Sequence, residues 1–174
     1  MKKTLYSILC GTLVICILFV GYLYFNNKIG VGKVRLKSNV TSLLDQDEDW
    51  IVSGEVSDTL AAYIMYSEDM KDFEFSIFVN RPGLSFGYFS HSGERTIAME
   101  ESIAEFTIDG YTERAFISMN RQKVKRVVIE DVNNFNEMDI NSEAPFVIIL
   151  PVDSGKISFY DADGNKLDYV NCPL

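Results

Sequence analysis

Several residue types on which enzyme chemistry depends are scarce in this chain of 174 residues. It has one histidine, His91, and one cysteine, Cys172, beyond an apolar N-terminal segment. A single histidine excludes the His-rich ligand sets of catalytic zinc sites. A single cysteine excludes a disulfide within the C-terminal part, which weighs against a eukaryotic secreted origin. The 4 Pro and 11 Gly form no repeat, which excludes collagen-like and low-complexity classes.

Acidic residues are absent from the first 44 residues, which hold six of the 16 Lys and Arg. Residues 45–174 hold all 25 Asp and Glu against the other 10 cations, a formal charge of −15. A surface of that sign repels phosphate backbones, so we expect no nucleic-acid partner. The chain is also too short for a barrel enzyme of about 250 residues, which leaves one domain of ordinary size.

The apolar run TLYSILCGTLVICILFVGYLYF, residues 4–25, contains no Asp, Glu, Lys, Arg or His. As a helix it measures roughly 33 Å, enough for a hydrocarbon core of about 30 Å. A cleaved signal peptide is one alternative, but no small-residue cleavage site follows the run. A lipoprotein signal is another, but neither Cys10 nor Cys16 follows a small residue. We therefore expect a retained single-pass anchor, with Tyr22 and Tyr24 at the membrane interface.

Two opposing signals bear on the orientation of this anchor. More cations follow the apolar run than precede it, which favours an exposed N-terminus by the positive-inside rule. The Lys2-Lys3 pair directly before the run, however, is how export signals begin, and long domains translocate largely regardless of charge. We expect the second signal to prevail, which predicts a cell-membrane protein with its C-terminal domain outside.

Residues 26–44 mix Gly, Asn, Ser and four cations without a sustained period. We interpret them as a basic juxtamembrane linker, either a simple stop-transfer flank or a segment drawn to anionic headgroups by about 1 kcal/mol per cation. The acidic run DQDED at 45–49 is predicted to be a solvated turn, because nothing fixes its geometry for calcium. The expected organisation is an anchor at 1–25, this linker at 26–44 and an extracytoplasmic β domain at 45–174.

Alternating hydrophobicity dominates the chain after Trp50. In DFEFSIFVN, residues 72–80, the odd-numbered apolar residues share one face, which is typical of a half-buried strand. Residues 81–83, Arg-Pro-Gly, break this run and LSFGYF at 84–89 resumes it, so the two segments are predicted to form a hairpin. Further strands are predicted at 50–57, 113–119, 123–130, 145–152, 155–160 and 166–171.

Two segments fit a helical period better than an alternating one. Residues 58–70 have Asp58 as a candidate N-cap, and Met99, Ile103 and Phe106 recur at i, i+4 and i+7. The expected fold is mainly β: a single-pass N-terminal transmembrane helix followed by an antiparallel β-sandwich or open barrel with at most two short helices. The predicted core contains Trp50, Phe73, Phe75, Ile77, Val79, Val147 and Ile149.

One motif suggests catalysis. GLSFG at 83–87 matches the nucleophile-elbow pattern, which would make Ser85 a nucleophile. That pattern needs a helix after the serine, whereas residues 86–90 continue an alternating strand, and His91 lies too soon after the serine. His91 is predicted to be an exposed residue of a hairpin tip, and Cys172 to be inert because it has no basic neighbour in sequence. No catalytic residue is assigned.

One candidate metal site and one basic cluster remain. In DADGN, residues 161–165, Asp161, Asp163 and Asn165 alternate like the first ligands of a calcium loop. The glycine does not occupy the EF-hand position, and flanking strands favour a β-turn, so calcium stays the alternative and no cofactor is expected. The cations Arg121, Lys123, Lys125 and Arg126 are predicted to form a solvated strand end, with a site for an anionic partner as the alternative.

Three runs carry a resemblance to a known group of proteins: FVNRPGLSFGYFSHSGE, ISMNRQKVKRVVIED and PFVIILPVDSGKISFYDADGNKL. Through them, residues 50–168 resemble small, uncharacterised single-pass surface proteins of Bacillus-type Gram-positive bacteria. These pair an N-terminal anchor with a compact β-rich ectodomain. Because the shared motifs are turn and strand patterns, the resemblance implies origin and location but transfers no site residue.

Two functions from different classes follow from these observations. The expected one is a non-enzymatic interaction or binding module that presents a β surface to another envelope protein, a wall polymer or a small ligand. The alternative is a surface hydrolase of unrecognised type that uses carboxylates. A pocket with two partly buried carboxylates favours the hydrolase, whereas an exposed flat patch of Tyr and Phe favours binding.

Overall fold

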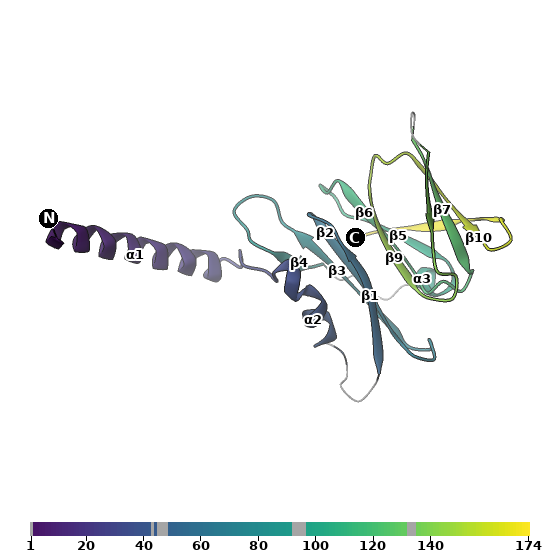
Figure 1. The fold of residues 1–174 in the computed structure, drawn as a ribbon, viewed down its shortest axis with the longest axis horizontal. Helices are drawn as coiled ribbons and strands as arrows, with labels where there is room; N and C mark the ends of the chain where they lie inside the picture. The colour runs from purple at the N-terminus through teal and green to yellow at the C-terminus, as the bar shows by residue number, and fades with distance from the viewer. Residues whose placement is uncertain (1, 43, 45–48, 92–96, 132–134) are drawn as a thin grey trace.

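A computed structural model describes residues 2–42, 44, 49–91, 97–131 and 135–174 of the chain. Figure 1 shows a long helix, α1 (Lys2–Phe25), that projects from a β-rich body formed by the rest of the described chain. Within α1, Ile8–Phe25 has a mean hydropathy of 2.4 and is long and apolar enough to cross a membrane. The helix therefore agrees with the predicted anchor in length and composition, two properties that signal sequences share.

The body is built almost entirely of strands. Its helical segments are the 3-10 turn η1 (Lys33–Arg35) and two short helices, α2 (Leu36–Thr41) and α3 (Ile97–Glu101). The strands are β1 (Trp50–Val56), β2 (Leu60–Ser67), β3 (Phe73–Asn80), β4 (Tyr88–Ser90), β5 (Ile103–Thr107), β6 (Glu113–Ser118), β7 (Val124–Glu130), β8 (Phe135–Asp139), β9 (Phe146–Pro151), β10 (Lys156–Asp161), β11 (Lys166–Leu167) and β12 (Tyr169–Pro173). The prediction of a mainly β fold with at most two short helices after the N-terminal helix is confirmed.

The strands form three four-stranded sheets. The first sheet has the order β1-β2-β3-β4, the central sheet β12-β5-β6-β9 and the outer sheet β11-β10-β7-β8. The C-terminal strand β12 lies parallel to β5, and the other strand pairs of the described sheets are antiparallel. In Figure 1 the first sheet lies on the α1 side of the body, with β7 and β10 of the outer sheet on the far side.

The central sheet is buried on both faces. Along β6, Ala115 and Ile117 pack toward the first sheet, while Phe116 between them packs toward the outer sheet. The core between the first and central sheets includes Phe73, Phe75, Ile77, Val79, Phe106 and Ile149. The core between the central and outer sheets includes Ile103, Phe116, Val127, Ile148, Ile157 and Phe159. This layering holds the loops at the ends of the strands on a rigid base.

A third core covers the remaining face of the first sheet. Leu36 and Val40 of α2 are fully buried there against Ala61, Tyr63 and Met65 of β2. Part of the segment predicted to be a juxtamembrane linker at 26–44 is therefore folded onto the body. Two of its apolar residues, Leu36 and Val40, lie on a helix of only six residues, which is too short for a period to be evident in the sequence.

The structure corrects the prediction of a helix at 58–70, where β2 forms instead. Leu60, Ala62 and Ile64 face the core shared with the central sheet, and the residues between them face α2. A strand buried on both faces shows an unbroken apolar run without alternation, and such a run is easily mistaken for a buried helix. The second predicted helix, over 99–106, is partly wrong, since α3 ends at Glu101 and β5 follows.

The other predictions of elements and core agree closely with the structure. The hairpin of residues 72–80 and 84–89 forms as β3 and β4, although only Tyr88–Ser90 are strand in its second arm. The strand predicted at 166–171 divides into β11 and β12, which belong to different sheets. The five predicted core residues Phe73, Phe75, Ile77, Val79 and Ile149 are buried, whereas Trp50 and Val147 are half-buried against the cores. Of the acidic run 45–49, all but Asp49 lies outside the described residues.

Candidate functional site

A polar hollow of about 450 Å³ lies where connections of the first and central sheets meet. We call it the loop-end cleft. It is lined by Thr59 from the β1–β2 turn, by the β3–β4 loop and by the β5–β6 turn. The residues contributed by these three segments are Thr59, Asn80, Arg81, Pro82, Gly83, Ser85, Gly110, Tyr111 and Thr112. They bring a guanidinium, a carboxamide and several hydroxyls into one concave surface.

Hydrogen bonds and two glycines shape the walls of the loop-end cleft. The backbone N–H of Asn80 donates to the carbonyl of Thr59 at 2.8 Å, and the Asn80 side-chain amide donates to the carbonyl of Asp58 at 3.1 Å. Gly83 and Gly110 have φ values of +87° and +83°, a left-handed conformation that residues with a side chain rarely adopt. The β3–β4 loop is therefore tied to the β1–β2 turn, and both turns that carry glycine keep their shape without strain.

Two larger side chains flank the polar groups of the loop-end cleft. The Arg81 guanidinium lies 4.2 Å from the centroid of the Phe89 ring, a cation–π contact that holds the charge beside the hollow. Tyr111 is half-buried and packs against the core between the first and central sheets. A bound molecule would therefore meet a positioned cation and a fixed aromatic wall.

One carboxylate lies behind the loop-end cleft. Glu113, at the start of β6, is half-buried, and its Oε2 accepts hydrogen bonds from the hydroxyls of Ser57 and Thr59. The Tyr88 hydroxyl donates to the Ser57 carbonyl. Burial, followed by the nearby charges of Asp58 and Glu113, raises the pKa of the Tyr88 phenol above its ordinary value, so the phenol remains a donor. Together these bonds join the first sheet to the central sheet beneath the cleft.

The structure places Ser85 in the loop-end cleft but not on a nucleophile elbow. Its hydroxyl donates to the carbonyl of Arg81 at 2.6 Å. The chain then continues into the strand Tyr88–Ser90 and not into a helix. His91 is exposed, and its backbone N–H donates to the Ile77 carbonyl at 2.7 Å, which extends the pairing of β3 and β4. The strand–turn–helix context that the GLSFG pattern requires is therefore missing.

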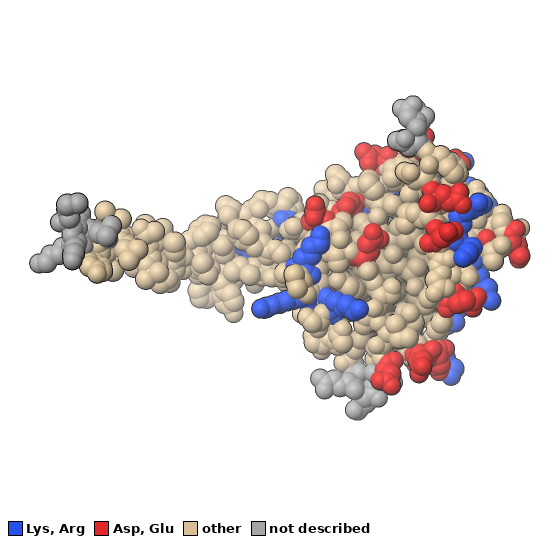
Figure 2. All heavy atoms as spheres, viewed as in Figure 1, with Lys and Arg blue, Asp and Glu red and all other residues tan. Residues whose placement is uncertain are grey.

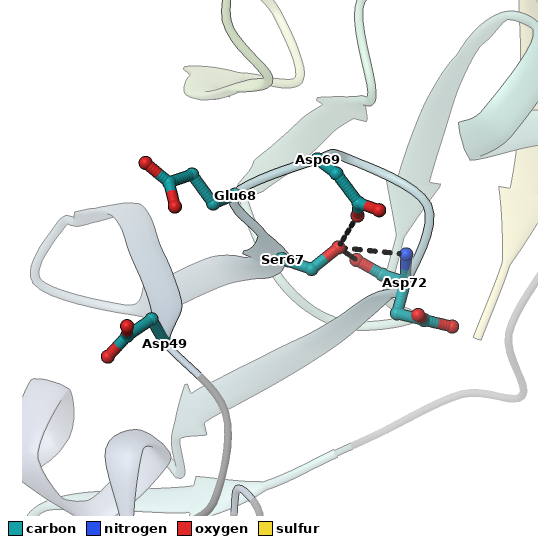
Figure 3. Close-up of a pocket in the computed structure, with 5 residues that line it drawn as sticks. All are labelled: Asp49, Ser67, Glu68, Asp69 and Asp72. Atoms are coloured by element: carbon teal, nitrogen blue, oxygen red, sulfur yellow. Dashed lines mark hydrogen bonds between the residues drawn. The ribbon is translucent and has the colours of Figure 1, made fainter.

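Four carboxylates surround a second hollow, of about 580 Å³, at the β2–β3 turn. Figure 3 shows Asp49 and Glu68 on one side of Ser67, and Asp69 and Asp72 on the other. All four acidic side chains are exposed to solvent. A general acid and base need environments that push their pKa values apart, which partial burial supplies and free exposure does not. This acidic hollow therefore does not favour the hydrolase alternative.

The hydrogen bonds of the turn beside the acidic hollow predict how the Asp69 carboxyl titrates with pH. Hydrogen bonds from Lys71 at 2.6 Å and from the Ser67 hydroxyl at 2.8 Å lower the pKa of Asp69 from 3.8 to about 2. A carboxyl with a lowered folded pKa stabilises the turn above about pH 4, and this contribution is lost as the pH falls toward 2. We expect carbon-13 NMR titration to place the Asp69 midpoint near pH 2, and Ser67→Ala to move it upward. A native midpoint at the ordinary value would contradict the turn geometry.

The calcium candidate, Asp161, Asp163 and Asn165, closes a β-hairpin. Asp161 Oδ1 accepts hydrogen bonds from the N–H groups of Asp163 at 2.9 Å and Asn165 at 2.8 Å, and the Asn165 amide donates to Asp161 Oδ2 at 2.9 Å. These bonds, the Asn165 side chain first, lower the pKa of Asp161. The predicted turn is present between β10 and β11. Lys125 and Arg126 line the same hollow together with Glu137, Asp139, Asp161 and Asp163.

Metal ligands and cysteines do not cluster in the part of the chain that the structure describes. No three His, Cys, Asp or Glu residues of that part lie in an arrangement that could hold a metal ion. Cys172 is half-buried in β12, and Cys10 and Cys16 lie in α1. All three cysteines are free thiols.

The basic cluster of residues 121–126 does not converge on one site. Three of its four cations have separate partners: Arg121 donates to the Met70 carbonyl, Lys123 pairs with Glu143 at 3.6 Å, and Arg126 pairs with Glu137 at 3.2 Å. The pairs of Lys123 and Arg126 are both solvent-exposed to a large degree. This arrangement fits the predicted solvated strand end better than a site for an anionic partner.

The sequence did not predict the loop-end cleft: Ser85 was expected in the second strand of the hairpin, whereas that strand begins only at Tyr88 and Ser85 lies in the loop before it. Thr59 falls in a segment with a helical pattern, and Tyr111 lies in a connection without a motif. The one available signal was Arg81-Pro82-Gly83, which predicts a loop but not the surface that this loop faces.

No protein-family model, no curated protein and no solved structure matches this chain. Its function is therefore argued from the geometry of its own sites.

Proposed function

We propose that this chain is a membrane-anchored, extracytoplasmic binding module whose loop-end cleft takes an uncharged, hydroxyl-rich segment of a wall polymer. The loop-end cleft is the observation that carries the proposal. It presents donors and acceptors from three loops, an aromatic wall at Tyr111 and a positioned cation at Arg81. Concave sites with a few converging polar groups on a rigid base are typical of specific ligand binding.

The charge of the chain supports an uncharged ligand. Residues 45–174 carry a formal charge of −15, which repels polyanions at long range. A hydroxyl-rich glycan avoids this repulsion and still exchanges hydrogen bonds with guanidinium, carboxamide and hydroxyl groups. A wall glycan therefore fits the cleft and its surroundings together.

Anchoring by α1 is supported by the exposure and composition of that helix. Only 6% of Ile8–Phe25 is buried in the structure, so the apolar surface of the helix has no protein partner there. Tyr22 and Tyr24, which are 57% and 71% exposed, lie at the end of α1 next to the body, as expected for an interfacial aromatic belt. A bilayer would cover this surface.

The proposed topology makes a direct prediction. Protease added to intact cells that express the full chain is expected to remove the body, because residues 45–174 lie outside the membrane. A cytoplasmic protein of the same cells serves as the control and should remain whole. If the body resists protease until the cells are lysed, the positive-inside count was the correct guide and the proposed orientation is wrong.

The proposed binding makes a second prediction. The full chain in lipid nanodiscs is expected to bind insoluble wall glycan in a sedimentation assay. Arg81→Ala should weaken this binding roughly tenfold or more, because hydrogen bonds from a charged donor contribute about 1.5–3 kcal/mol. Arg121→Ala removes an arginine outside the cleft and should leave the binding unchanged. If Arg81→Ala binds the glycan as tightly as Arg121→Ala does, the ligand binds outside the loop-end cleft.

The same assay separates the binding module from the hydrolase alternative. Wall glycan recovered intact after incubation supports binding alone. Release of soluble fragments that is lost in Glu113→Gln would assign catalysis to the half-buried carboxylate behind the cleft and would reverse the proposal.

A further inference from the structure

An edge of the first sheet lies immediately after α1. Residues 28–31 run beside residues 86–88: the N–H of Gly30 donates to the Phe86 carbonyl at 2.7 Å, and the N–H of Val31 donates to the Tyr88 carbonyl at 2.8 Å. Only Asn26 and Asn27 separate α1 from this edge. The body is therefore joined to the helix by a short, hydrogen-bonded connection and not by a long flexible linker.

This connection fixes how far the edge can lie from a bilayer. Three residue steps, from Phe25 to Lys28, span at most about 11 Å. The headgroup region on each side of the hydrocarbon core is roughly 5–8 Å thick. If Ile8–Phe25 spans the core, as the proposed function requires, the edge at residues 28–31 lies in or directly beside the headgroup layer.

Large apolar side chains are exposed along this edge. Ile29 and Phe86, which form a bridge between the two segments, are 47% and 53% exposed. Leu84 in the β3–β4 loop is 61% exposed, and Val34 in η1 is 97% exposed. Exposed apolar groups of this size next to a membrane anchor are typical of side chains that enter the boundary between headgroups and acyl chains.

Basic side chains accompany these apolar residues. Lys28, Lys33, Arg35 and Lys37 follow α1, and the first 44 residues contain no acidic residue. Figure 2 shows Lys and Arg side chains gathered on the body next to α1. Arg35 also lines a hollow of about 400 Å³ together with Gly30, Gly32 and Ser38. Lys33 Nζ lies 3.4 Å from Asp58 Oδ1, and both side chains are exposed. Because an exposed ion pair of this kind is weak, Asp58 competes only weakly with anionic headgroups for Lys33.

We propose that Ile29, Val34, Leu84 and Phe86, with Lys28, Arg35 and Lys37, form a membrane-side face that docks on anionic phospholipid headgroups. The proposal rests on the membrane anchoring described under the proposed function. Apolar side chains supply insertion, and the cations supply attraction to the anionic surface, so the two kinds of residue act on the same bilayer. Docking holds the body in one orientation instead of letting it pivot about Asn26 and Asn27.

The β3–β4 loop connects this docking to the loop-end cleft. Leu84 belongs to the membrane-side face, while its neighbours Gly83 and Ser85 line the cleft. When Leu84 enters the headgroup layer, the cleft is held close to the membrane surface. The ligand of the cleft would then be a polymer segment that lies next to the membrane and not one deep in the wall.

The test uses the full chain, with its three cysteines replaced by alanine, in vesicles of phosphatidylcholine with or without phosphatidylglycerol. A fluorescent label is attached at Leu84→Cys or, in a second variant, at Val34→Cys, where the native side chain is almost fully exposed. Headgroup-spin-labelled lipid is expected to quench these labels at least about twofold more in the anionic vesicles. A label at Phe135→Cys, an exposed residue of the outer sheet, is the control and should not be quenched in either.

Charge variants identify the lipid partner. Neutralising Lys28, Arg35 and Lys37 to Gln should weaken docking on the anionic vesicles roughly fivefold per cation and remove most of its salt dependence. Neutralising Lys125, Lys156 and Lys166, on the outer sheet, should change nothing. Equal quenching in the two vesicle types, or equal effects of the two charge variants, would overturn recognition of anionic headgroups.

Failure of docking is distinguishable from failure of anchoring. A chain that floats with vesicles and resists alkaline extraction, yet keeps the label at position 84 open to an aqueous quencher, is anchored but not docked. This result overturns the membrane-side face alone. A chain that alkaline carbonate extracts from the vesicles lacks a spanning α1, which overturns the anchoring and the docking together.

Discussion

Replacing Glu105 by Gln is expected to lower the free energy of unfolding by about 3–5 kcal/mol. Glu105 Oε1 lies 2.7 Å from Arg114 Nη1 between the central and outer sheets, where the side chains are only 7% and 12% exposed. Gln keeps the shape of the side chain but leaves the guanidinium in the core without a counter-charge. The other contacts of Arg114 are long: its Nη2 reaches Ser154 Oγ at 3.4 Å and the Gly155 carbonyl at 3.5 Å, and its guanidinium lies 5.5 Å from the centroid of the Phe116 ring. Its Nε is buried without a hydrogen-bond partner.

Urea denaturation of the full chain in detergent, followed by far-ultraviolet circular dichroism, measures this loss. Glu130→Gln is the matched control, because its pair with Lys156 is 3.6 Å long and exposed, and its loss should cost less than about 1 kcal/mol. The double variant Glu105→Leu, Arg114→Met should recover most of the stability, because no buried charge then remains unpaired. If Glu105→Gln is as mild as Glu130→Gln, the pair is not buried in solution.

The sequence predicts β3, whose apolar residues alternate, better than β2, which is buried on both faces. β3 alternates and was predicted with its core residues, including Phe75 and Ile77. β2 is covered by the central sheet on one face and by α2 on the other, so its residues are apolar throughout and carry no period-2 signal. Two-sided burial is a property of the stacked sheets, which a single strand cannot reveal.

The candidate site was less predictable than the fold. The loop-end cleft depends on contact between Asn80, Thr59 and the β5–β6 turn, three segments that are distant in sequence. Each segment alone is an ordinary polar turn, and the one motif among them, GLSFG at 83–87, suggests a nucleophile elbow that the structure does not have. Its position follows from the pairing of β2 with β3 and of β5 with β6, so the cleft becomes visible only when the register of both sheets is known.

Replacing Phe75 by Ala is expected to destabilise the chain by about 3–5 kcal/mol. The Phe75 ring is 8% exposed and stacks on Phe106, with ring centroids 5.1 Å apart and planes at 26°. Removing it opens a cavity between the first and central sheets. The paired strands on either side hold the cavity open, because they cannot move closer without breaking hydrogen bonds in their own sheets.

Two probes test whether this loss spreads through the whole body. Trp50, the only tryptophan of the chain, reports on the first sheet, and circular dichroism reports on all three. Because Phe75 joins the first sheet to the central one, both urea transitions should shift together in Phe75→Ala. Phe135→Ala truncates a ring that is 64% exposed and should shift neither by more than about 0.5 kcal/mol. A shift of the Trp50 transition alone would mean that the first sheet unfolds separately, and the body would then be two cooperative units joined at the Phe75–Phe106 contact.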